Sequence, residues 1–192
     1  MRKLVVSMWI TLDGFIAGPN GAMDWVNAIF DEAMANYEAE VLGAADTLVL
    51  GRITYQSFAG AFTQLADNPS ASPGEREYAR KMNAMRKVVF SKTLDKGDWN
   101  NSMLLRDVSP EQIKQLKQEP GQNMLIYGSA SIVQALTNHG LIDEYQLLVH
   151  PVVLGDGKPL FADARQQTKL DLLKTKTHPS GVVLLYYQPA HA

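Results

Sequence analysis

The 192-residue chain contains no cysteine. Disulfide bonds, thiolate nucleophiles and cysteine-ligated metal sites are therefore excluded. No apolar run approaches the length of a membrane span. The first ten residues, MRKLVVSMWI, place basic residues before an apolar stretch, as a signal peptide does. That stretch ends at Thr11 and Asp13 without a small-residue cleavage site, so we interpret it as a first β-strand.

The chain also lacks a large excess of either positive or negative charge, because its formal net charge is only −2. No broad basic surface is predicted for binding nucleic acid or anionic lipid, although a local phosphate site is still compatible with this charge. The four histidines, His139, His150, His178 and His191, lack metal-ligand spacing, so we expect no metal site. We expect a cytoplasmic protein that binds neither nucleic acid nor membranes.

What the chain does contain is typical of a globular protein, with 46% apolar and 20% charged residues. We predict one domain over residues 1–192, since no repeat or low-complexity linker divides the chain. Residues 63–85 are polar and turn-rich, with a short charged helix expected over residues 75–85. We interpret this segment as a surface excursion.

Short apolar runs alternate with helical patterns along most of the chain. Strands are predicted near residues 4–12, 47–50, 87–90, 103–105, 124–126 and 144–149, and a C-terminal hairpin is predicted from residues 169–177 and 182–187. Asp24 is the expected cap of a helix running to about Val41, and Ser109 that of a helix with Pro110 at its first position. This order predicts an α/β fold with a mainly parallel central sheet, helices on both sides and an antiparallel C-terminal hairpin.

The stretch Asn123–Leu136 (NMLIYGSASIVQAL) combines a buried strand, a small-residue turn at Gly128 and a helix that Ser129 or Ser131 can cap. Unpaired amides and the helix dipole make such a turn a possible anion site, although an ordinary strand–helix junction has the same pattern. Gly14, Gly51 and Ser91 also follow predicted strands. Because ligands bind beyond the carboxyl ends of parallel strands, these positions are expected to converge.

In five segments the chain resembles the dihydrofolate-reductase-like superfamily, in the branch of the riboflavin-biosynthesis reductases. The segments are SMWITLDGFIAG (residues 7–18), LVLGRITYQSF (48–58), VVFSKTL (88–94), LIYGSASIVQAL (125–136) and LIDEYQLLVHPVVLGDGKPLF (141–161). They span most of residues 3–187 in the family's order. The resemblance implies a three-layer dihydrofolate-reductase-like fold and NADPH as the cofactor. The deaminase half of the bifunctional enzymes is not expected, because its zinc signature is missing.

The resemblance also implies which residues bind the phosphates of NADPH. In the segment Gly51-Arg52-Ile53-Thr54, Arg52 is expected to contact the adenosine 2′-phosphate and Thr54 the pyrophosphate. A guanidinium suits bidentate phosphate contact, although a solvated surface arginine is the alternative. Ser91 and Lys92 match the strand end that flanks the same phosphate, and an exposed lysine is equally compatible with Lys92.

The glycine-rich turn of the family, which receives the pyrophosphate, corresponds to Gly128, Ser129, Ala130 and Ser131. Many relatives have two glycines where this chain has Gly128 and Ser129. In dihydrofolate reductases that pair carries a cis peptide bond, so the resemblance predicts a cis bond between Gly128 and Ser129.

Around the nicotinamide, the resemblance implies Trp9, Ile16 and Ala17. Relatives often have a small residue at the position of Trp9, so its ring is expected to narrow the substrate pocket, unless it is simply a core tryptophan. For the catalytic acid, Asp24 and Asp31 lie in the matching region and the alignment does not choose between them. A helix cap explains Asp24 equally well, and a solvated helix face explains Asp31.

The expected activity is hydride transfer from NADPH to a small heterocyclic substrate, either a ribosylamino-pyrimidine or a pteridine-like compound. A non-catalytic protein that binds NADPH, or a pterin or flavin precursor, is the alternative, since no acid is assigned unambiguously. Dihydrofolate reductase itself is a less favoured third possibility. Relatives dimerise through their C-terminal sheet region, so a homodimer is expected. The sequence does not identify the physiological substrate.

Overall fold

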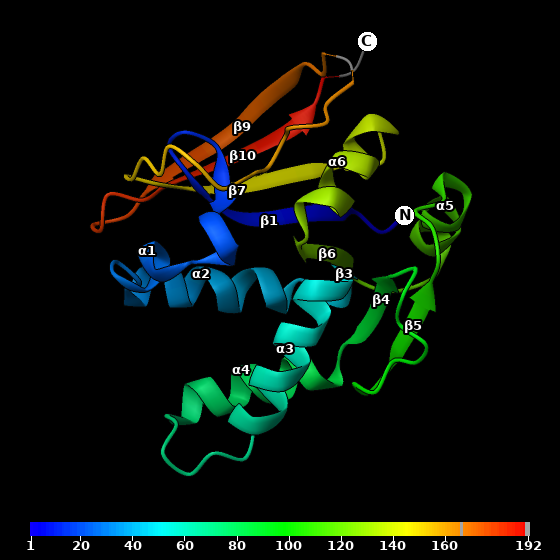
Figure 1. Cartoon of the computed structure of the whole chain (residues 1–192), viewed down its shortest axis with the longest axis horizontal. Coiled ribbons are helices and arrows are strands. Elements are labelled where there is room, and N and C mark those ends of the chain that lie inside the picture. Colours follow the sequence, from blue (N-terminus) through cyan, green and yellow to red (C-terminus); the bar gives the residue numbers. More distant parts are fainter. Residues whose placement is uncertain (166, 191–192) are drawn as a thin grey trace.

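The structure, a computed structural model, describes residues 1–165 and 167–190, so His191 lies outside the described residues. A large sheet is covered by helices on both faces (Figure 1). The elements in chain order are β1 (Leu4–Thr11), β2 (Phe15–Ala17), a 3₁₀ turn (Pro19–Gly21), α1 (Asp24–Asn27), α2 (Glu32–Gly43), β3 (Ala45–Gly51), α3 (Arg52–Leu65), α4 (Pro73–Ala84), β4 (Arg86–Phe90), β5 (Ser102–Leu105), α5 (Pro110–Gln118), β6 (Asn123–Gly128), α6 (Ala130–Asn138), β7 (Glu144–His150), β8 (Lys158–Pro159), β9 (Leu170–Thr177) and β10 (Val183–Pro189).

The main sheet has eight strands in the order β5-β4-β3-β6-β1-β7-β10-β9. Neighbouring strands from β5 to β7 are parallel, and β10 runs antiparallel to both β7 and β9. This confirms the predicted mainly parallel sheet with a C-terminal hairpin. Within residues 151–161, β8 pairs with β2 in a second, two-stranded sheet.

The core lies on both faces of the central strands, which explains why these strands read as nearly continuous apolar runs. On one face, Ile113 of α5 and Val133 of α6 pack with Val6. On the other face, Met34 of α2 and Met82 of α4 pack with Leu125. The molecule therefore has three layers, with α5 and α6 on one side and α2, α3 and α4 on the other (Figure 1).

The helix predicted to run from a cap at Asp24 is in fact two helices. Asp24 is the first residue of the four-residue α1, whose cap position is Met23. The chain then becomes extended at Asp31, and the Asp31 carboxylate accepts the backbone N–H of Met34 at 2.8 Å. Asp31, rather than Asp24, therefore caps the long helix, because its extended backbone aims the side chain at the first turn.

Residues 63–85 contribute more than a surface excursion. The predicted helix is present as α4, which begins with a capping box between Ser72 and Glu75. Its apolar side packs inward, and Ala79 and Met82 are fully buried. The predicted helix after Ser109 is also confirmed as α5. Within the described residues, none of the helices has the length and apolar character needed to cross a membrane.

Candidate active site

The carboxyl ends of the parallel strands β3, β4 and β6 meet at one edge of the sheet. Gly51 at the end of β3 pairs with Phe90 of β4, and Leu50 pairs with Gly128 at the end of β6. The turns that follow touch each other: a methyl group on Gly51 would overlap the Ser129 hydroxyl, and one on Gly128 would lie 2.9 Å from Thr54 Oγ1. The predicted Gly51–Thr54 and Gly128–Ser131 segments are therefore adjacent.

The turn at Gly128 has the backbone that the resemblance predicts. The peptide bond between Gly128 and Ser129 is cis, and Gly128 has a φ of +135°, a region that favours glycine. Ser129 occupies the cap position of α6, but its hydroxyl lies 2.8 Å from the Ser131 hydroxyl. The expected side-chain cap by Ser129 or Ser131 is not found within the described residues.

Among the described residues, two helix starts at this edge, like the short α1, have no side-chain cap. In the described part of the chain, α3 and α6 have no side-chain hydrogen bond at their N-caps, Gly51 and Ser129. By contrast, α2, α4 and α5 are capped by Asp31, Ser72 and Ser109. The first amides of α3 and α6 thus lack the usual side-chain acceptor, which suits them to an external anion.

The basic side chains beside these helix starts are exposed. Arg52 donates a hydrogen bond from Nη1 to Gln56 Oε1 at 3.0 Å, which leaves most of its donors to other partners. Lys92 forms an ion pair with Asp107 at 3.1 Å. Ser91 is buried, and its hydroxyl accepts the backbone N–H groups of Thr93 and Leu94 at 3.2 and 2.9 Å. The Ser91 hydroxyl therefore shapes the loop that carries Lys92.

Ile16 and Ala17 belong to β2, which the small sheet fixes next to the end of β1. Asp13 holds this region to the loop after β7. Its carboxylate accepts the backbone N–H groups of Leu154 and Gly155 at 3.0 and 2.8 Å. The Thr11 hydroxyl donates to Asp13 at 2.6 Å and is the main cause that lowers the pKa of Asp13. Asp13 thus connects the turn between β1 and β2 to Thr11 at the end of β1 and to the loop after β7.

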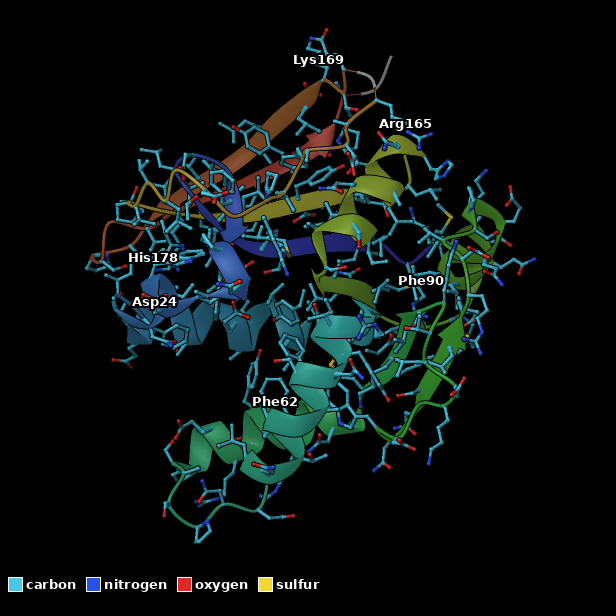
Figure 2. The ribbon with its side chains drawn as sticks, in the orientation of Figure 1. Asp24, Phe62, Phe90, Arg165, Lys169 and His178 are labelled. Atoms are coloured by element: carbon cyan, nitrogen blue, oxygen red, sulfur yellow. The ribbon has the colours of Figure 1, made fainter. Side chains whose placement is uncertain are left out.

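The two candidate acids lie at the first residue of α1 and at the cap position of α2. Asp24 is exposed and, in Figure 2, lies at the α1 corner, well apart from Phe90 at the end of β4. Asp31 is half-buried, and the backbone N–H of Met34 is the main cause that lowers its pKa. Asp31 is therefore engaged as a helix cap, and the structure does not bring either aspartate into contact with the Gly128 turn.

A carboxylate that the sequence analysis missed lies among the aromatic residues at the same strand ends. Glu38 of α2 is 6% exposed. Its Oε1 accepts the indole N–H of Trp9 at 2.9 Å, and its Oε2 accepts the hydroxyl of Tyr127, the residue before Gly128, at 2.8 Å. Burial raises the pKa of Glu38 to about 7, against two hydrogen bonds that lower it. A buried carboxyl group whose pKa is raised this far is typical of a functional site.

The sequence did carry a signal for Glu38. Met34, Tyr37, Val41 and Leu42 repeat at helical spacing and form the buried side of α2. Position 38 falls within that stripe, so a glutamate there has to be buried. Trp9 is half-buried, and its ring meets Phe30 edge-to-face with centroids 6.0 Å apart.

The fold and this arrangement of strand ends define the class of protein. A dihydrofolate reductase from Enterococcus faecalis, described as complexed with NADP(H), superposes with a TM-score of 0.62 at 13% identity, covering 98% of this chain and 97% of that one. At that identity the similarity shows the fold alone, and the fold is dihydrofolate-reductase-like.

The chain belongs to the RibD C-terminal domain family, which it matches over residues 2–184. It is 37% identical over 186 residues to the uncharacterized protein YyaP of Bacillus subtilis (strain 168), covering 97% of this chain and 94% of that protein.

Solved structures of proteins named for riboflavin biosynthesis or its reductase step have the same fold. A putative riboflavin biosynthesis protein from Shewanella sp. PV-4 has a TM-score of 0.77 at 21% identity, with full coverage of both chains. A diaminohydroxyphosphoribosylaminopyrimidine deaminase/5-amino-6-(5-phosphoribosylamino)uracil reductase from Thermotoga maritima has a TM-score of 0.68 at 17% identity. This chain is covered to 98% in that match but spans only 57% of the Thermotoga chain. These structures support a reductase fold.

Proposed function

We propose that this protein is an NADPH-dependent reductase that transfers hydride to a small heterocyclic substrate of the ribosylamino-pyrimidine or pteridine kind. The observation that carries the proposal is the contact between the uncapped starts of α3 and α6, where Gly51 meets Ser129 and Gly128 meets Thr54. Membership of the RibD C-terminal domain family and the dihydrofolate-reductase-like fold support the same reaction class.

The phosphates of NADPH fit the residues at this edge. The first amides of α3 and α6, with the Thr54 hydroxyl, form a cradle for a pyrophosphate, and side chains on Gly51 or Gly128 would fill it. Arg52 is exposed beside the start of α3, and its guanidinium suits the 2′-phosphate that distinguishes NADPH from NADH. Ser91 and Lys92 are proposed to flank that phosphate.

Trp9, Ile16 and Ala17 are proposed to surround the nicotinamide, at the end of the site opposite Arg52. NADPH supplies the hydride when it is bound, so the chain needs no covalent nucleophile. The residues of β1 and β2 orient the two reactants and exclude water from them. Asp24 and Asp31 are still the candidates for a proton donor, although Asp31 also serves as the cap of α2.

The capping role of Asp31 favours one other function, that of a protein that binds NADPH, or a pterin or flavin precursor, without turnover. One experiment separates the two. The protein is titrated with NADPH and with NADH, and oxidation of NADPH is then followed with 7,8-dihydrofolate and with a ribosylaminopyrimidine. Tighter binding of NADPH than of NADH together with oxidation is the expected result. Binding without oxidation would favour the non-catalytic function, and the absence of NADPH binding would overturn the reductase.

A homodimer through the C-terminal sheet is part of the proposal. β9 is the edge strand of the main sheet, and Leu172 and Leu173 on it are 53% and 48% exposed. An exposed edge strand with apolar side chains readily pairs with another chain. Light scattering tests this, because the dimer predicts twice the mass of the 21.2 kDa chain.

A further inference from the structure

Glu38 is the buried centre of a group of half-buried aromatic side chains, here called the Glu38 cluster: Glu38, Trp9, Tyr127 and Tyr78. They come from α2, β1, β6 and α4. Glu38 accepts from the indole of Trp9 at 2.9 Å and from the hydroxyl of Tyr127 at 2.8 Å. Tyr78 lies beside Tyr127. Each oxygen of the carboxylate thus holds one aromatic side chain.

The cluster is poorly explained as a device for stability. A buried carboxylate pays a desolvation cost, which a charged partner would offset. Here the causes that act on the Glu38 pKa, in the described part of the chain, are burial and the two neutral donors, Trp9 and Tyr127. The titratable groups that face Glu38 are Tyr127 from β6, Tyr78 from α4 and Tyr37 from its own helix. Burial, and after it the charge of Glu38, raises the pKa of each tyrosine. An apolar residue at position 38 would avoid this cost.

Trp9 and Tyr127 both lie next to groups of the proposed site. Tyr127 immediately precedes Gly128, and the peptide bond between Gly128 and Ser129 lies at the start of the proposed pyrophosphate cradle. Trp9 stands two residues before the end of β1, at the proposed nicotinamide end. An indole can rotate about two side-chain bonds, so a fixed acceptor on its N–H selects one orientation. The carboxylate selects that orientation for Trp9, while Phe30 meets the ring from the side.

We propose that Glu38 is a positioning residue whose carboxylate fixes Trp9 and Tyr127 as one rigid aromatic wall at the nicotinamide end of the site. This inference rests on the proposed function, which places the nicotinamide at Trp9. Glu38 acts through these two side chains rather than by touching the substrate. The wall limits the site to reactants that fit beside an indole ring.

The wall is expected to depend on the proton of Glu38. An ionised carboxylate accepts from Trp9 and Tyr127 at the same time. A protonated carboxyl has to donate from one oxygen, so the Tyr127 hydroxyl must turn to accept. The environment of Trp9 therefore changes when Glu38 titrates, and burial sets the pKa of Glu38 near 7.

The test is a pH titration of tryptophan emission between pH 5 and 9 (on the order of two units either side of the pKa). Trp25 lies against His150, with ring centroids 4.9 Å apart, so its emission is also expected to vary with pH. Subtracting the titration of Trp9→Phe removes Trp25 and Trp99 and leaves the Trp9 signal. We expect a midpoint within about one unit of 7 in the difference. Glu38→Gln should abolish it, and the exposed Glu40→Gln on the same helix should keep it.

A binding arm separates this inference from the proposed function. The probe 2′,5′-ADP carries the adenosine phosphates without the nicotinamide. Glu38→Leu is expected to weaken NADPH about five- to tenfold (on the order of 1 kcal/mol) and to change 2′,5′-ADP binding less than about twofold. Tyr127→Phe, which keeps the Trp9 bond, serves as the milder variant if Glu38→Leu does not fold, and it should lower NADPH affinity less.

The outcomes are distinct. If the wild-type protein binds neither NADPH nor 2′,5′-ADP, the proposed function fails. The Trp9 titration still tests whether Glu38 positions Trp9. A Trp9 signal that does not titrate, or that titrates unchanged in Glu38→Gln, overturns the positioning role. Equal losses of NADPH and 2′,5′-ADP affinity in Glu38→Leu or Tyr127→Phe would indicate a general structural role and would also overturn it.

Discussion

The two ends of the proposed nucleotide site are built in opposite ways. At the phosphate end, Arg52 and Lys92 are exposed, and the starts of α3 and α6 have no cap from Gly51 or Ser129 in the described residues. At the nicotinamide end, Trp9, Glu38 and Tyr127 are joined by hydrogen bonds, and Glu38 is buried.

This difference follows from what each end has to recognise. A phosphate brings its own charge and its own acceptors, so the protein only has to leave donors free at the right place. The neutral nicotinamide ring has no such charge and fewer acceptors. Its orientation therefore depends on side chains that are already held rigidly before it binds. Loss of donors should therefore reduce affinity at one end, and loss of rigidity should reduce it at the other.

The largest effect is expected from Gly128→Ala. A methyl group at φ +135° is strained, and it would lie 2.9 Å from Thr54 Oγ1 in the cradle. We expect NADPH affinity to fall by at least about 100-fold, or some 2.7 kcal/mol, as for a blocked and strained site. Calorimetric titration measures this. Gly60→Ala is the matched control, because a methyl group at Gly60 meets nothing within 4 Å. Unchanged binding by Gly128→Ala would place the cradle elsewhere.

Arg52→Gln should have the next largest effect and should act on one cofactor only. The guanidinium is proposed to bind the 2′-phosphate, so its loss removes a charge-assisted contact of about 1.5–3 kcal/mol. NADPH affinity is expected to fall roughly 10- to 100-fold, while NADH affinity stays the same. Competition between the two cofactors measures the preference, with the exposed Arg80→Gln on α4 as the control. An equal loss for both cofactors would contradict the assignment to the 2′-phosphate.

At the other end, the pH dependence of stability should change in Glu38→Gln. The folded-state pKa is raised to about 7, so between pH 4.5 and 7 the folded protein holds a proton that the unfolded chain has lost. Glu38 therefore lowers stability as pH rises through this window, by up to about tenfold in the unfolding equilibrium constant per pH unit. Above pH 7 its contribution no longer changes.

Denaturant unfolding of both proteins at several pH values measures this contribution as a difference. Subtraction is needed because His150 acts in the opposite direction. Burial lowers the pKa of His150, so its buried neutral ring lowers stability as pH falls below about 6.5. The difference between wild type and Glu38→Gln cancels His150. A difference that is flat from pH 4.5 to 7 would mean that Glu38 keeps an ordinary pKa in the folded protein.

The smallest effect is expected from Lys92→Gln. Lys92 and Asp107 are 79% and 73% exposed, and exposed ion pairs contribute little. Asp107 also offsets the lysine charge near any phosphate. We expect NADPH affinity to change by about threefold or less, and less at high salt than at low salt. A loss as large as that of Arg52→Gln would make Lys92 a main phosphate ligand and would extend the phosphate end along β4.

Much of the fold could be predicted from the sequence, because buried parallel strands leave continuous apolar runs. Leu125 and Val49 sit in such runs, and both are fully buried. Helix starts were harder to predict. Asp24 and Asp31 are equally good caps as residue types, and the choice between them depends on the extended backbone at Asp31, which packing sets. β8 is too short to leave a periodic signal, so only its pairing with β2 revealed it.

The chain order of residue types determined by itself that this protein has a parallel α/β core and that small turns follow its strands, because burial on two faces and backbone freedom at glycine are local properties. It also indicated which residues are candidates for a phosphate site. Only the tertiary structure decided that the Gly51 and Gly128 turns touch, and that Glu38 meets Trp9 and Tyr127. Those residues are far apart in the chain, and nothing local fixes a contact between them.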